Sequence, residues 1–222
     1  MTSTTGSAVA TDESGRRTRG SASSTPVEMR LLLIFAGVLL GGVNALANYG
    51  HLPYSPYVSK VVGNDWAWLT LGYLSARFAM STRQAFNRAL LVLGPAVATY
   101  YLADWPLFHH ATPDVIVPPT GFILEALIWA VVATATSGGL AAISGVARLG
   151  GLIGATADAV VPGFIAWTAY RSHRFQVDIP QGADLVLRDV TAVIWPSALA
   201  ITVGVLINGL AVYLSTRRSE DH

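Results

Sequence analysis

Four ionisable side chains lie within long apolar stretches of this sequence, where a charge is costly. They are Arg77, Asp104, Glu125 and Asp158. On insertion scales a charged residue at the centre of a membrane helix costs about 2.5 to 3.5 kcal/mol, so such a group normally faces a partner or a watery cavity. These four residues are therefore the first candidates for binding or for chemistry.

Asp158 lies deepest within its apolar stretch. It shares a helical face with Gly151, Gly154 and Pro162, so another helix can approach it closely. Arg77 lies at a depth that Asp158 can reach, and we expect the two to form an ion pair. The pair could act as a proton or substrate switch, or it could be a structural pair that fixes helix packing. Alternatively, Arg77 extends to the lipid headgroups.

A second cluster of polar residues is expected near the outer face of the bilayer. Asn44 and Asn48 lie one turn apart, Glu125 lies about one turn inside the outer boundary of its stretch, and Asp104 lies near the outer end of another. Together these residues could line a cavity that opens to the outside. Asparagine also holds membrane helices together, at about 0.6 kcal/mol per hydrogen bond, and that alternative remains open.

Small residues mark the faces where helices are expected to pack. Gly37 and Gly41 share the face of Asn44 and Asn48, so this segment is expected to form the inner wall of a bundle. The remaining residues assigned to helix packing are Gly154, Gly204 and Asn208.

Metal, cofactor and enzyme sites are not expected. The sequence has no cysteine, and His51, His109, His110 and His173 have no diagnostic ligand spacing. It contains no zinc-protease motif, no nucleophile elbow and no phosphate-binding glycine loop, so we predict a protein that is not an enzyme. With a net charge of +1 and no basic patch interleaved with aromatic residues, no nucleic-acid partner is expected either.

The patterning predicts an all-α fold, a polytopic transmembrane helix bundle. Charged residues make up 12% of the chain, about half the share in soluble domains. We expect a disordered cytoplasmic tail over 1–28, a membrane domain over 29–214 and a second cytoplasmic tail over 215–222. The six expected spans are 29–48, 65–80, 89–108, 121–143, 151–170 and 189–214.

Two of these spans have alternatives. The first could be a cleaved signal peptide, because Ala45-Leu46-Ala47 resembles a cleavage site, but the many later spans favour a retained helix. The second is short, and it is the one most open to doubt if the count is not six. Residues 49–57, with two prolines and three tyrosines, predict an interfacial loop rather than a helix.

Basic residues predict the orientation. In the six-span topology, ten Lys and Arg side chains lie on the side of the two termini and four lie on the other side. The excess places both termini in the cytoplasm, although three arginines between 171 and 188 count against it. Thirteen of the fourteen basic residues are arginine, a composition typical of GC-rich bacterial genomes, so we expect a bacterial plasma membrane protein.

Four short motifs resemble those of a family of small multi-pass bacterial membrane proteins of unknown function. They are the segments 41–48, Gly-Gly-Val-Asn-Ala-Leu-Ala-Asn; 65–68, Asp-Trp-Ala-Trp; the arginine-bearing connection 77–88; and 100–104, Tyr-Tyr-Leu-Ala-Asp. The resemblance implies a helical bundle in the plasma membrane. It brings no established activity and no catalytic residues.

Two functions from different classes follow. The first is a small-molecule or ion transporter, or a membrane substrate-binding component, that uses the ionisable residues and asparagines above. The second is a non-catalytic membrane scaffold or accessory subunit, whose small-residue faces bind a partner membrane protein or a second copy. In either case the expected surroundings are the lipid bilayer.

Overall fold

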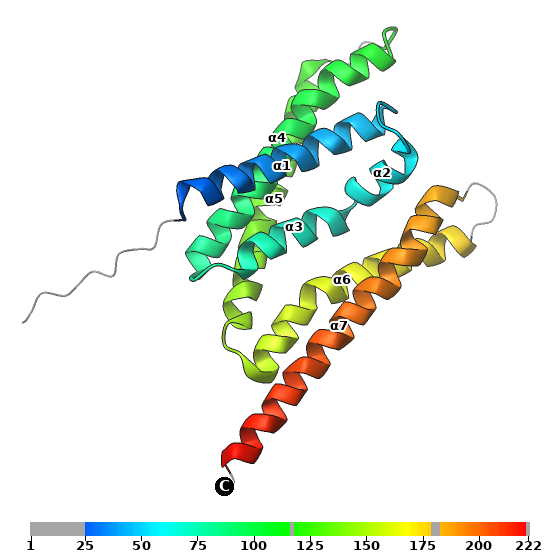
Figure 1. Ribbon diagram of the computed structural model, residues 1–222. Helices are drawn as coiled ribbons and strands as arrows, with labels where there is room; N and C mark the ends of the chain where they lie inside the picture. Colours follow the sequence, from blue (N-terminus) through cyan, green and yellow to red (C-terminus); the bar gives the residue numbers. More distant parts are fainter. Residues whose placement is uncertain (1–24, 116–117, 179–182, 221–222) are drawn as a thin grey trace, which may run out of the picture.

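The computed structural model describes residues 25–115, 118–178 and 183–220, and it confirms an all-α fold. The predicted tail over 1–28 lies outside the described residues up to position 24. The described part forms seven helices (Figure 1). They are α1 (Val27–Asn48), α2 (Ser55–Val62), α3 (Asp65–Arg77), α4 (Thr82–Ala111), α5 (Pro119–Ala147), α6 (Gly151–Asp178) and α7 (Leu185–Glu220).

Four of these helices, α1, α5, α6 and α7, are long and apolar enough to cross a membrane. Large apolar side chains such as Leu124, Val131 and Ile207 are exposed, whereas most of the buried apolar residues are alanines. A soluble protein buries its large apolar residues, so this inverted arrangement fits a surface that faces lipid. The described helices are therefore those of a membrane protein.

Hydrogen bonds between helices define two ends of the bundle. At the first end, Gln84 at the start of α4 donates to Thr25 beside the start of α1 (3.4 Å), and Arg148 after α5 donates to the carbonyl of Ala79 (3.3 Å). At the second end, Asn48 of α1 donates to the hydroxyl of Tyr100 on α4 (3.1 Å). Helices α1 and α4 therefore both run from the first end to the second, side by side (Figure 1).

Because α1 and α4 are parallel, the segment between them must return the chain to the first end. That return is made by two helices rather than one, α2 and α3, which are separated by Gly63 and Asn64. At 1.5 Å per residue α3 alone is about 20 Å long, too short for a hydrocarbon core of about 30 Å. The predicted second span over 65–80 is shorter in the structure, since α3 runs from Asp65 to Arg77.

Residues that follow α2 satisfy the free carbonyl groups at its C-terminal end. The last four carbonyls of a helix have no partner within the helix. In α2 all four accept hydrogen bonds from the next segment, two of them from tryptophan indoles. The pairs are Gly63 N to Ser59 O (2.8 Å), Asn64 Nδ2 to Lys60 O (2.6 Å), Trp66 Nε1 to Val61 O (2.9 Å) and Trp68 Nε1 to Val62 O (2.9 Å).

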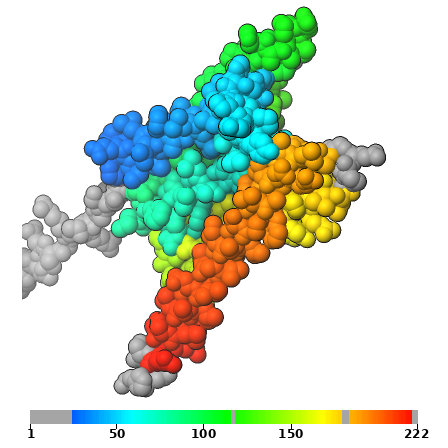
Figure 2. Space-filling view, turned by 45° about the vertical axis from the view of Figure 1, so that its right-hand side comes forward, coloured from blue at the N-terminus to red at the C-terminus, as the bar shows by residue number. Residues whose placement is uncertain are grey.

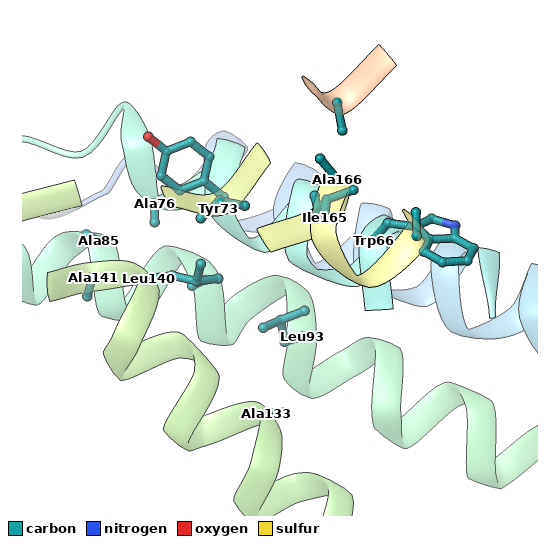
Figure 3. Close-up of a cluster of buried hydrophobic side chains, with 14 of the residues drawn as sticks. Trp66, Tyr73, Ala76, Ala85, Leu93, Ala133, Leu140, Ala141, Ile165 and Ala166 are labelled. Atoms are coloured by element: carbon teal, nitrogen blue, oxygen red, sulfur yellow. The ribbon is translucent and has the colours of Figure 1, made fainter. Parts of the chain in front are cut away.

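The core joins the return segment to the other helices. Side chains of α3, α4, α5 and α6, including Trp66, Leu93, Leu140 and Ile165, pack in one cluster (Figure 3). Helices α6 and α7 form a long antiparallel pair beside it. The C-terminal part of α7 projects beyond the other helices (Figures 1 and 2).

Several predicted boundaries are corrected. Helix α2 begins at Ser55, inside the stretch 49–57 that was predicted to be an interfacial loop. It can do so because Pro56 lies in its first turn, where proline is tolerated. Helix α6 continues to Asp178 rather than ending near 170. Helix α7 runs to Glu220 through the predicted tail 215–222.

Candidate functional site

A cavity of about 720 Å³ lies at the break between α2 and α3. Its wall contains Asn44 and Asn48 of α1, Gly63 and Asn64 at the break, and one face of α5. That α5 face presents Glu125, Trp129, Val132 and Thr136, at the i, i+4, i+7, i+11 spacing of a single helical stripe. The structure thus brings three of the four residues predicted for the outer cavity, Asn44, Asn48 and Glu125, into one wall.

The fourth predicted residue, Asp104, is not in this wall. Its Oδ1 accepts a hydrogen bond from the Tyr49 hydroxyl (2.9 Å), which ties α4 to the residue that follows α1. The sequence placed Asp104 at the correct end of the bundle but could not show which neighbour it faces. Asp104 therefore lies next to the cavity wall, beside the lining residue Tyr100, and is not part of that wall.

Asn44 is buried, with only 6% of its surface exposed, and its Oδ1 has no hydrogen-bond partner in the described part of the chain. This oxygen lies beside the break, 2.7 Å from the place where a Cβ on residue 63 would stand. A side chain at position 63 would press on the Asn44 amide and on the Ser59 carbonyl oxygen, which lies 2.5 Å from the same place. Buried polar atoms are nearly always satisfied, so this unpartnered acceptor, which is itself closed to solvent, marks an unusual place beside the cavity.

The only base in the wall, Lys60, is already paired. Its Nζ lies 2.8 Å from Oδ2 of Asp184, the residue just before α7, and it holds the pKa of that carboxyl below its usual range. The wall also contains two acids, Asp65 and Glu125. Neither has a salt-bridge partner among the described residues.

The predicted ion pair between Arg77 and Asp158 is confirmed. Arg77 Nε lies 2.5 Å from Asp158 Oδ1 and Nη2 lies 2.9 Å from Oδ2, so the pair is bidentate and joins α3 to α6. The Tyr73 hydroxyl also donates to Asp158. Neither charged residue lines the cavity. The sequence analysis missed Tyr73, although its position one turn before Arg77 puts both side chains on one face.

Three of the predicted packing residues lie at tight backbone contacts. A Cβ on Gly37 or on Gly41 would collide with the carbonyl oxygen of Val92 or of Ala96 on α4, so α1 and α4 meet backbone to backbone. A Cβ on Gly154 would lie 2.7 Å from the carbonyl oxygen of Ala147. These contacts are possible only because the three residues lack side chains.

The other two predicted packing residues, Gly204 and Asn208, are not at tight helix contacts of the kind seen at Gly37 and Gly41 in the described part of the chain. Both are exposed, and nothing lies within 4 Å of a Cβ built on Gly204. The neighbouring glycine, Gly209, is buried against Ala155 of α6 instead. Hydrophobic periodicity shows which residues share a helical face. It does not show which of two small-residue faces packs against another helix.

Within the described ranges, no group of three or more His, Cys, Asp or Glu side chains converges to hold a metal ion. The Nδ1 atom of His109 lies 2.8 Å from the Trp105 carbonyl oxygen, and that of His173 lies 3.3 Å from the Arg188 carbonyl oxygen.

Comparisons of the chain with known protein families, with curated proteins and with solved structures find no match.

Proposed function

We propose that the chain crosses the membrane six times, with the second crossing made by the broken helix α2–α3. The parallel course of α1 and α4 supports this, since two parallel crossings need a return crossing between them. The excess of basic residues at the end that holds the start of α1 and of α4 supports cytoplasmic termini. Composition supports a bacterial plasma membrane.

We further propose that the protein is a small-molecule or ion transporter, or a membrane substrate-binding component, and that the cavity is its binding site. The observation that carries the proposal is a cavity of about 720 Å³ beside a helix break, which adjoins the buried Asn44 with its unpartnered Oδ1. Non-helical backbone at membrane depth is tolerated only where it is buried in protein or lines a watery cavity. Broken helices of this kind form the substrate sites of many transporters.

The Arg77–Asp158 pair has a supporting role in this proposal. It joins the far end of α3 to α6, so it holds the return segment in place from the end away from the break. A change in the angle of α3 would have to move this pair. We infer that it sets the position of α3 rather than contacting a substrate.

The proposal can be tested by binding to the purified protein in lipid nanodiscs. Thermal stability is measured with a panel of amino acids, amines, sugars, nucleosides and inorganic salts. A compound that binds only the folded state raises the melting temperature. Val132→Trp should abolish the shift because Val132 lines the cavity, whereas Val131→Trp, on the exposed neighbouring position, should preserve it. If no compound gives a shift that Val132→Trp removes, the proposal is wrong.

One observation favours the second candidate, a scaffold or accessory subunit. Gly204 and Asn208 are exposed along a helix that is apolar enough to cross a membrane. An exposed asparagine on such a helix can bind a helix of another protein or of a second copy. Co-purification of a stoichiometric partner that Asn208→Leu releases, with no response to any ligand in the panel, would support this candidate against the first.

A further inference from the structure

We propose that the cavity binds an organic ammonium cation that carries N–H donors and an apolar body. This inference rests on the proposed function and names the class of substrate. Two properties of the wall support it: its charge and its aromatic surface.

Some polar groups of the wall have hydrogen-bond or ion-pair partners within the protein, and others have none among the described residues. Four of the wall's side-chain donors have partners within the protein: Lys60 binds Asp184, Asn48 donates to Tyr100, and Asn64 and Trp68 donate to carbonyls of α2. By contrast, the oxygen of Asn44 is an acceptor with no donor in the described part of the chain. The Asn44 oxygen is closed to solvent, so a ligand in the cavity reaches it only if the amide rotates.

The charge of the wall favours a cation. Lys60 is neutralised by Asp184, which leaves the carboxylates of Asp65 and Glu125 without a salt-bridge partner in the described residues. The start of α3 would otherwise attract an anion, because helix N-termini carry partial positive charge. Asp65 occupies the first turn of α3 and offsets that charge. An ammonium group suits both carboxylates, since each accepts charge-assisted hydrogen bonds.

The aromatic residues of the wall favour an organic cation over an inorganic one. Trp68, Trp129, Tyr100, Tyr101 and Phe164 all line the cavity. The indole N–H of Trp68 is already donated to the Val62 carbonyl, so its ring presents π surface rather than a donor. Aromatic faces attract ammonium groups and also pack against apolar bodies. A volume of about 720 Å³ accommodates a ligand well above the size of a hydrated metal ion.

The test compares three probes of one shape on the full-length protein in nanodiscs. They are phenethylammonium, the neutral 2-phenylethanol and the anionic 3-phenylpropanoate, with empty nanodiscs as the blank for partition into lipid. Binding is followed by tryptophan fluorescence. We expect phenethylammonium to bind at least about tenfold more tightly than the alcohol, since charge-assisted hydrogen bonds are stronger than neutral ones. The anion should not bind.

Substitutions of the two acids in the wall test whether the cation binds in this cavity. Glu125→Gln and Asp65→Asn should each weaken binding of phenethylammonium by about tenfold and leave the weak binding of the alcohol unchanged. Glu28→Gln is the matched control, because Glu28 is an exposed acid in the first turn of α1, at the opposite end of the bundle. It should bind as the wild type does. The comparison of the three probes needs no variant, so it stands even if a variant fails to fold.

The inference is overturned if the alcohol or the anion binds as tightly as the cation, or if Glu28→Gln weakens binding as much as Glu125→Gln. If neutral or anionic compounds bind and Val132→Trp blocks them, the substrate class is wrong but the proposed function stands. If no compound binds in a way that Val132→Trp blocks, both proposals fail.

Discussion

Asp158 satisfies its carboxylate with groups from a single neighbouring helix. Arg77 contributes two nitrogens and Tyr73 contributes its hydroxyl, all from one face of α3. The side chains of Arg77 and Asp158 keep 32% and 22% of their surface exposed, so the pair is only partly removed from solvent or headgroups. The contribution of this pair is best measured by removing one partner. The remaining charge would then be uncompensated and would face apolar helices, which is unfavourable.

A double-mutant cycle tests this at the residue scale. We expect Arg77→Gln and Asp158→Asn each to destabilise the protein by about 1 to 2 kcal/mol, and the double variant to cost less than the sum of the two. Unfolding of the purified protein in detergent measures the three values. Arg30→Gln, at an exposed arginine on α1, should have almost no effect. Strictly additive single effects would show that the two side chains are not coupled.

Individual residues differ in how well the sequence predicts them. The Arg77–Asp158 pair could be predicted because a charge in an apolar stretch has few possible partners at its depth. Asp104 and Gly204 could not be placed, since helical periodicity defines a face without saying what lies opposite it. Tyr73 was missed because a tyrosine in a membrane helix is equally well explained by an interface. The orphan oxygen of Asn44 depends on the fold around Gly63, which no local pattern encodes.

Among the elements, the pair α1 and α4 shows how the sequence sets the distance between helices. Gly37 and Gly41 lie one turn apart and bring the two backbones together along one seam. This contact fixes the depth at which Asn44, three residues beyond Gly41, meets the cavity. The packing of α1 on α4 therefore also positions the candidate binding group.

A pair of neighbouring glycines tests this packing. A Cβ on Gly41 would overlap the carbonyl oxygen of Ala96, which belongs to the backbone and cannot rotate away. We expect Gly41→Ala to destabilise the protein by about 1 to 3 kcal/mol, as for overpacked cores. At Gly42 the new Cβ would meet only Thr99 Cγ2, at 3.7 Å, an ordinary contact. Gly42→Ala should be neutral or slightly stabilising in the same unfolding assay. Equal losses at both positions would contradict this account.

Most of the helices found from the sequence have one uninterrupted apolar signal, although α4 was also found, as the predicted span 89–108. Helices α1, α5, α6 and α7 each provide it. The return segment does not, because Gly63 and Asn64 divide it into helices of 8 and 13 residues. Trp66 and Trp68 resemble interfacial residues in the sequence, yet their indoles cap the carbonyls of α2. Their role depends on a helix end that hydropathy does not reveal.

For the whole molecule, the decisive question is whether the α2–α3 segment crosses the bilayer. The residues before and after it lie at opposite ends of the bundle: His51 follows α1, and Met80 precedes α4. If the segment crosses, these two positions face opposite sides of the membrane. If it only dips into the bilayer and returns, they face the same side, and α1 and α4 could not both span in parallel.

The absence of cysteine makes this measurable without first altering the chain. Single cysteines are introduced at four exposed positions, His51, Met80, Asp114 and Ser215. A membrane-impermeant maleimide applied to intact cells should label His51→Cys and Asp114→Cys, and should leave Met80→Cys and Ser215→Cys unlabelled. All four should react in permeabilised cells, and the wild type in neither. Equal labelling of His51→Cys and Met80→Cys from one side would exclude a second crossing. It would also remove the six-pass arrangement on which the cavity at the broken helix depends.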